Sequence, residues 1–113
     1  MEESRKFRVT SVNNATYIAL QSNILPSIEK CEDGKVEFVF PYNIAIVAIN
    51  REYRRAIKGK EPRMVDLKDF IYLRNNLVSN KRDVLNEDTH KFVYRENEDI
   101  PSHYHKVGEI GER

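Results

Sequence analysis

The chain has few of the residues on which several classes of protein depend. It contains 1 cysteine, 4 glycines and 4 prolines in 113 residues, and it has no tryptophan. One cysteine permits no internal disulfide, which fits a reducing compartment, so we expect a cytoplasmic protein. The longest apolar run, residues 44–49, is too short to span a bilayer, and residues 1–9 lack the basic and apolar segments of a signal peptide. We therefore expect neither a membrane protein nor a secreted one.

The familiar sequence motifs of catalysis are also missing. There is no glycine-rich phosphate loop, no HExxH motif, no CxxC pair and no GxSxG elbow. His103 and His105 alternate along the chain and could supply two metal ligands, but a zinc site needs about four. We expect a non-enzymatic protein with no catalytic residue, no cofactor and no metal.

A cluster of charged residues around the single cysteine keeps one enzymatic alternative open. Cys31 is most simply a small buried apolar residue, because a nucleophile needs a histidine base and an electropositive setting. Carboxylates lie close to two lysines here, namely Glu29, Glu32, Asp33 and Glu37 beside Lys30 and Lys35. A carboxylate and lysine nuclease is thus a third alternative, although alternating charges on a hairpin are more often solvated cross-strand pairs.

Charge is distributed unevenly along the chain, although the formal net charge is only +1. Residues 1–50 have a net charge of −1, residues 51–82 carry 10 basic and 4 acidic groups for +6, and residues 83–113 carry 4 and 8 for −4. A basic block therefore precedes an acidic end, and partners of either sign have to be considered.

The order of periodic segments predicts an α+β fold with the order β-α-β-β-α-α-β, in which a small antiparallel sheet is covered by helices on one face. The expected elements are a strand at 6–10, a helix at 15–22 capped by Asn13 or Asn14, a hairpin at 27–40, helices at 44–59 and 67–80 capped by Asn43 and Asp66, and a strand at 90–95. The last strand could pair with either the first strand or the hairpin. We expect one domain at residues 1–95 and an acidic, flexible tail at 96–113.

The hairpin is the central element of this prediction. Asp33 and Gly34 between two alternating segments favour a two-residue type I′ turn. That loop would place Lys30 opposite Glu37 and Ile28 opposite Val39 on one side of the hairpin. The other side, predicted to face the core, would carry Cys31, Val36, Phe38 and Phe40.

The helix predicted from Ile44 changes character along its length. At about 100° per residue, one stripe is apolar throughout, consisting of Ile46, Ile49, Tyr53, Ala56 and Ile57. An opposite arc of about 100° carries four basic residues, Arg51, Arg54, Arg55 and Lys58. Ile44, Val47 and Ala48 lie off the stripe, so a homodimer could bury them, unless the third helix or the tail packs there.

Arg74 interrupts the apolar arc of the third helix, which consists of Leu67, Phe70, Ile71, Leu73, Leu77 and Val78. Its long side chain could lie over apolar neighbours or pair with a carboxylate such as Glu29. The sharper alternative is that Arg74 anchors a ligand phosphate or carboxylate.

Motifs between residues 14 and 80 resemble a family of small uncharacterised bacterial and bacteriophage proteins. They are the helix with Thr16, Tyr17, Ala19 and Leu20, an Ile-Glu strand, a Gly-Lys turn, a Phe-Val-Phe strand, Tyr53, Gly59 and Val65-Asp66-x-x-x-Phe70. Asn23 stands where that family would use glycine. A left-handed position tolerates asparagine in place of glycine. The resemblance implies a phage or mobile-element origin and no particular activity.

Two functional hypotheses follow from these features. The first is an accessory protein that binds the nucleic-acid backbone through a basic surface, formed by Arg51, Arg54, Arg55, Lys58, Lys60 and Arg63 with help from Lys81 and Arg82. The second is a protein-binding inhibitor or regulator of a host system, of the anti-defence type, which uses the apolar start of the second helix and the acidic tail.

Overall fold

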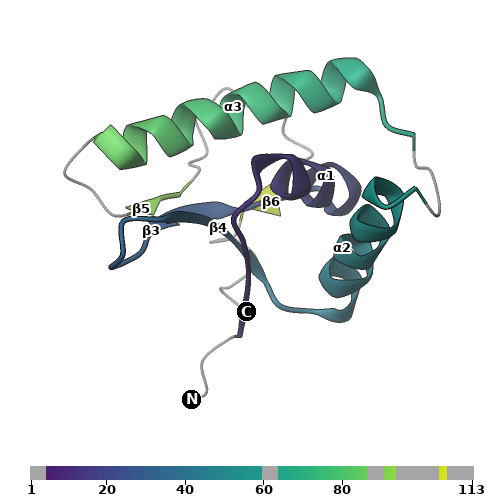
Figure 1. Cartoon of the computed structure of the whole chain (residues 1–113), viewed down its shortest axis with the longest axis horizontal. Helices are drawn as coiled ribbons and strands as arrows, with labels where there is room; N and C mark the ends of the chain where they lie inside the picture. The colour runs from purple at the N-terminus through teal and green to yellow at the C-terminus, as the bar shows by residue number, and fades with distance from the viewer. Residues whose placement is uncertain (1–4, 60–63, 87–90, 94–104, 107–113) are drawn as a thin grey trace.

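The predicted α+β fold is confirmed by a computed structural model that describes residues 5–59, 64–86, 91–93 and 105–106 (Figure 1). In this part of the chain an antiparallel sheet has the strand order β1-β4-β3-β5, and helices cover one of its faces. The elements are β1 (Lys6–Val9), α1 (Val12–Ser22), β2 (Ile24–Leu25), β3 (Ser27–Lys30), β4 (Val36–Pro41), α2 (Ile44–Ile57), α3 (Leu67–Asn86), β5 (Lys91–Phe92) and β6 (His105–Lys106).

Helix α1 begins earlier than predicted. The Ser11 hydroxyl accepts a hydrogen bond from the backbone N–H of Asn14 at 3.2 Å, so Ser11, and neither predicted asparagine, is the N-cap. Serine and asparagine are about equally good caps, and local sequence could not choose between them. At the other end the prediction was right, because Asn23 adopts the left-handed conformation with φ 61° and closes the helix onto Ala19.

The hairpin loop has one residue more than predicted. The backbone N–H of Cys31 donates to the Lys35 carbonyl at 2.7 Å, and that of Gly34 donates to the Cys31 carbonyl at 2.9 Å. The loop therefore consists of residues 32–34, with Gly34 at φ 89°, and the predicted two-residue turn is wrong. Aspartate and glycine occur in hairpin loops of two residues and of three residues, so these residue types alone do not decide the loop length.

The longer loop shifts the register of the hairpin by one residue. Ile28 pairs with Phe38 and Glu29 with Glu37. A shift of one residue moves every side chain of a strand to the opposite face. Ile28 is consequently in the core, and Cys31 lies on the outer face beside Glu37, both contrary to the prediction.

The core lies between the sheet and helices α1 and α3. The buried cluster comprises Ala15, Ile18, Ala19, Leu25, Ile28, Val36, Phe38, Phe40, Ile46, Leu73, Leu77 and Val84. Phe7 and Val9 of β1 pack against it, as predicted. Val84 belongs to a final part of α3 that the prediction missed, because the charged residues 81–83 hide the continuing apolar stripe.

The last strands join two distant parts of the chain to the domain. β5 pairs with β3 of the hairpin, one of the two predicted alternatives, and Phe92 packs against the core. β6, which was not predicted, pairs in parallel with β2. Most of the predicted tail lies outside the described residues. No helix in the described ranges is long and apolar enough to cross a membrane.

Candidate anion-binding surface on helix α2

Helix α2 forms where local sequence predicts it. The Asn43 side-chain oxygen accepts a hydrogen bond from the backbone N–H of Ile46 at 2.9 Å, so Asn43 is the N-cap. The helix ends at Ile57, and Gly59 follows with φ 78°. Arg54 and Arg55 lie in the last turn, where positive charge offsets the helix dipole.

Helix α2 packs on α1 and away from the sheet (Figure 1). Of its residues only Ile46 is buried, and Ile57 at the end of the predicted apolar stripe is 63% exposed. Ile49 is partly buried and packs against the core, and polar and aromatic contacts also join α2 to α1. The Tyr17 hydroxyl donates to Glu52 Oε1 at 3.1 Å, and the rings of Tyr17 and Tyr53 lie 5.8 Å apart between centroids.

The four basic residues predicted on one arc of α2 share one exposed face of the helix. All four side chains, Arg51, Arg54, Arg55 and Lys58, are exposed. They line an open hollow of about 510 Å³, here called the α2 hollow. Such a volume lies within the usual range for ligand sites in proteins, ~300–1,000 Å³. We call these four residues the basic face.

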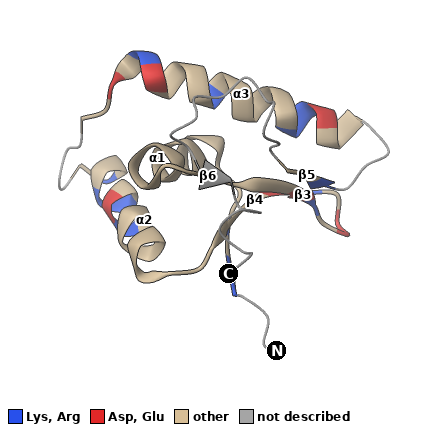
Figure 2. Ribbon diagram, turned by 180° about the vertical axis from the view of Figure 1, so that it is seen from behind, with Lys and Arg blue, Asp and Glu red and all other residues tan. Residues whose placement is uncertain are grey.

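No acidic side chain among the described residues lines the α2 hollow. Glu52, the acidic residue of α2, is half-buried and accepts the Tyr17 hydroxyl hydrogen bond on the α1 side. Figure 2 shows the basic segments of α2 together with this single acidic band. The described lining of the hollow therefore includes four cationic side chains and no carboxylate, which favours an anion.

Val47 and Asn50 also line the α2 hollow. The sequence did not predict either of them as part of the binding surface. Asn50 is about 40° from Arg54 around the helix, so the helical periodicity that located the basic arc also predicts this position. The residue was missed because it is uncharged. Its side-chain oxygen accepts a hydrogen bond from Asn14 Nδ2 at 2.9 Å.

The other predicted binding residues are placed elsewhere or not described. Lys60 and Arg63 lie outside the described residues. Lys81 lies in the part of α3 far from α2 (Figure 1) and lines a separate hollow of about 290 Å³ with Lys35. Arg82 is in the same turn of α3 and is exposed.

Arg74, predicted as a ligand anchor or a partner of Glu29, forms a different contact. Its Nε atom donates to the side-chain oxygen of Asn13 at 2.6 Å, which ties α3 to the start of α1. Glu29 is too far along the sheet and pairs with Arg8 and Lys91 instead. The suggested ion pair was wrong because the partner of a side chain depends on which elements pack together.

The face of α2 that carries the basic residues has an apolar first half. Ile44 is 87% exposed, and Ala48 is exposed as well. Within the part of the chain that the structure describes, neither α3 nor any other element covers Ile44. The N-terminal half of this face is thus available for a partner, whereas its C-terminal half is basic.

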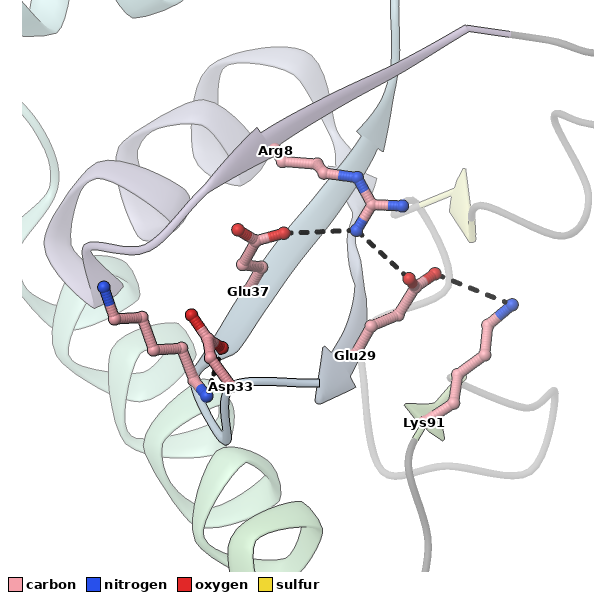
Figure 3. A network of polar contacts seen from close by, with 6 residues as sticks. Arg8, Glu29, Asp33, Glu37 and Lys91 are labelled. Carbon is pink, nitrogen blue, oxygen red and sulfur yellow. Dashed lines mark hydrogen bonds and ion pairs between the residues drawn. The ribbon is translucent and has the colours of Figure 1, made fainter. Parts of the chain in front are cut away.

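A second group of charges lies on the outer face of the sheet (Figure 3). Arg8 Nη1 is 3.2 Å from Glu37 Oε1 and 3.2 Å from Glu29 Oε1, and Lys91 Nζ is 3.7 Å from Glu29 Oε2. Each of the four strands contributes one residue, so this charge ladder crosses the whole sheet. Burial acts to lower the pKa of Arg8, but its hydrogen bonds to the two carboxylates outweigh this and raise the pKa.

Cys31 adjoins this ladder without the features of a nucleophile. Partial burial raises the pKa of the Cys31 thiol, and a hydrogen bond to Glu37 and the charge of that carboxylate raise it further. A reactive cysteine needs a lowered pKa, so the thiol is held in its unreactive form. Within the described ranges no group of three or more histidine, cysteine or acidic residues could hold a metal ion.

No family model, curated protein or solved structure matches this chain. The resemblance to small bacterial and bacteriophage proteins therefore stays a prediction. Any functional argument has to come from the geometry of the chain itself.

Proposed function

We propose that this domain is a small non-enzymatic accessory protein that binds the nucleic-acid backbone through the basic face of α2. In keeping with the predicted resemblance and the single cysteine, we propose that a phage or mobile element encodes it and that it acts in the cytoplasm. The proposal concerns phosphate contacts and includes no catalytic step.

One observation carries this proposal: four exposed cations line one open hollow in which no described residue is acidic. The planar guanidinium groups of the three arginines suit phosphate oxygens, to which they can donate two parallel hydrogen bonds. Exposed helix faces are commonly charged, but mixed signs are the usual pattern. Charge of one sign on one face supports an anionic partner.

The same geometry supports binding of low sequence specificity. The basic residues lie on a helix face with no described aromatic residue in the α2 hollow on which a base could stack. Phosphate contacts position a protein on nucleic acid without reading its sequence. We therefore expect similar affinities for unrelated sequences of one length and strand state.

Binding of labelled oligonucleotides at several salt concentrations tests this proposal. Fluorescence anisotropy with a duplex, a DNA single strand and an RNA single strand should show complexes at tens of micromolar protein in about 50 mM salt. If the four cations each neutralise one phosphate, log K against log salt should fall with a slope of roughly −3 to −4 for duplex DNA. Absence of binding to all three probes at this salt concentration would refute the proposal.

A second candidate function is supported by the exposed Ile44 at the start of the same face. Single exposed apolar residues are ordinary, but here Ala48 and the half-buried Val47 extend the apolar area along the same side of the helix. This area suits a protein partner, either a host protein that the domain inhibits or a second copy of the chain. Nucleic acid that copurifies before a high-salt wash would favour the first function, and its absence would favour this one.

A further inference from the structure

Asn50 differs from its cationic neighbours because a second helix holds its side chain. Its Oδ1 atom accepts a hydrogen bond from Asn14 Nδ2 at 2.9 Å, and both side chains are half-buried. The arginine and lysine side chains of the basic face are exposed and carry more rotamer freedom. Asn50 is therefore the fixed polar group of the α2 hollow, and the cations are its adaptable groups.

The hydrogen bond to Asn14 determines which end of the Asn50 amide meets the hollow. A side-chain amide is planar, with the oxygen and the nitrogen on separate branches of one carbon. Because the oxygen is directed at α1, the Nδ2 group is left for the hollow that Asn50 lines. Among the described residues this nitrogen has no acceptor.

Asn14 is itself held in place by the first turn of α1. Its backbone N–H donates to the hydroxyl of the N-cap Ser11, and the next residue, Ala15, is fully buried. Its side-chain oxygen is buried and accepts no hydrogen bond from the described residues. The Asn14 amide therefore forms no other described contact that competes with its bond to Asn50.

We propose that the α2 hollow is a phosphodiester site in which Asn50 Nδ2 donates a hydrogen bond to a phosphate oxygen, with Asn14 as the residue that positions it. This inference rests on the proposed function. The polar side-chain groups of the described lining are then all donors, because lysine and arginine side chains have no acceptor and the Asn50 oxygen is engaged. Such a lining suits a group that offers only acceptors, which is the property of a phosphodiester.

The amide and the cations contribute to binding in ways that salt can separate. A cation that neutralises a phosphate releases a counterion, so its removal reduces the steepness of the salt dependence by about 0.9. A neutral donor releases no counterion. Its removal should lower the affinity by the same factor at every salt concentration.

The decisive experiment compares Asn50→Ala with Arg54→Ala in the salt titration with duplex DNA. We expect Asn50→Ala to lower the affinity about tenfold at each salt concentration with an unchanged slope, since a hydrogen bond to a charged group is lost. We expect Arg54→Ala to flatten the slope by about 0.9. A titration line for Asn50→Ala that coincides with the wild-type line overturns the inference and leaves the proposed function intact, whereas no binding by the wild type overturns both.

A double-mutant cycle tests the role given to Asn14. Asn14→Leu removes the bond and the orphaned buried oxygen but keeps the branched shape of the side chain, so the fold should persist. We expect about a threefold loss of affinity at unchanged slope, and no further loss when Asn14→Leu is added to Asn50→Ala. Additive losses would contradict a role of Asn14 in positioning Asn50.

If Asn50→Ala weakens the packing of α2 on α1, its loss of affinity has two causes. Asn50→Asp separates them. An aspartate at position 50 can still accept the hydrogen bond from Asn14 Nδ2, so the contact between the helices is kept. It presents a carboxylate to the hollow in place of a donor. We expect a larger loss of affinity than for Asn50→Ala at an unchanged melting temperature, and binding equal to that of the wild type overturns the inference.

Discussion

The outer face of the sheet and the basic face of α2 are both charged, but their charges are arranged differently. On the sheet, Glu37 and Glu29 lie on the two central strands between Arg8 and Lys91 on the outer strands, so each cation has a carboxylate beside it (Figure 3). On α2 the charges of the hollow are all positive, and Glu52 contacts Tyr17 on α1 instead.

This difference separates charges that hold the fold from charges that attract a partner. In the sheet ladder each cation has a carboxylate at 3.2–3.7 Å, so little field is left outside the molecule. On α2 the field of the basic face extends into solvent, where salt screens it over about 8–10 Å. Stability should therefore respond to changes in the ladder, and binding should respond to changes on α2.

The largest expected effect is the loss of binding when the basic face is reversed. Replacing Arg51, Arg54 and Arg55 by glutamate should lower the affinity for duplex DNA at least about 100-fold at 50 mM salt, because three phosphate contacts become repulsive. These side chains are exposed, but Arg54 and Arg55 lie in the last turn of α2, where glutamate opposes the helix dipole, so the free energy of unfolding should fall by about 1–2 kcal/mol while the domain stays folded. Anisotropy and denaturant unfolding measure the two quantities.

A matched control separates the basic face from net charge. Replacing Lys6, Lys35 and Lys68 by glutamate also changes the formal net charge from +1 to −5, since each reversal removes two charges. These lysines are exposed and lie on β1, directly after the hairpin loop and on α3. We expect this variant to keep most of the wild-type affinity. Equal losses in both triple variants would show that only overall charge matters.

Reversal in the sheet ladder should have the opposite outcome. Arg8→Glu would bring three carboxylates together across β1, β4 and β3, and we expect it to lower the free energy of unfolding by about 1–2 kcal/mol. Arg8→Met loses the pairs without adding repulsion and should cost less than about 1 kcal/mol. Binding should not change in Arg8→Met. Chemical denaturation at low and high salt measures these changes. Equal free energies of unfolding for Arg8→Glu and the wild type would contradict the prediction.

A smaller effect is expected at Cys31, where the ladder meets a titratable thiol. Because the folded-state pKa of this thiol is raised, it should react more slowly with iodoacetamide at pH 8 in the folded protein than in urea. Glu37→Gln removes a charge that raises the pKa and should speed the reaction about two- to threefold. The same shift means that this thiol's contribution to stability falls as pH rises through the pKa of the unfolded thiol. Equal reaction rates for the folded and unfolded protein would contradict a raised pKa of the Cys31 thiol in the folded state.

The smallest effect on stability is expected at the apolar half of the α2 face. Ile44→Ser should change the free energy of unfolding by less than about 0.5 kcal/mol, because Ile44 is 87% exposed. If a second copy covers this half, sedimentation at high micromolar concentration should show a wild-type dimer that the substitution dissociates. A wild-type species of 13.3 kDa would leave a host protein as the remaining candidate for this surface.

Sequence alone predicted most elements of the fold because their determinants are local. Asn43 and Asp66 cap α2 and α3 as expected, since an N-cap and the N–H group that it accepts lie within one turn. Asn23 closes α1 for a similar reason. The errors arose where neighbouring residues allow two solutions, as with Ser11 at the start of α1 and the loop length of the hairpin.

The candidate site was predictable only in part. Helical periodicity placed Arg51, Arg54, Arg55 and Lys58 on one arc, and the structure has them on one exposed face. It did not reveal that Glu52 contacts Tyr17 or that Asn14 holds Asn50. Those contacts join residues more than 30 positions apart, and no local pattern encodes them.

The amino-acid sequence by itself determined where the three helices lie, the caps of α2 and α3 and the arc of basic residues, because backbone geometry and side-chain spacing are properties of a few consecutive residues. Tertiary structure decided which charges are neutralised, because that depends on which strands and helices lie side by side. Arg8 meets Glu29 and Glu37 only because β1, β4 and β3 are neighbours in the sheet. On α2, which packs on α1, no described acidic side chain lines the hollow beside the basic face.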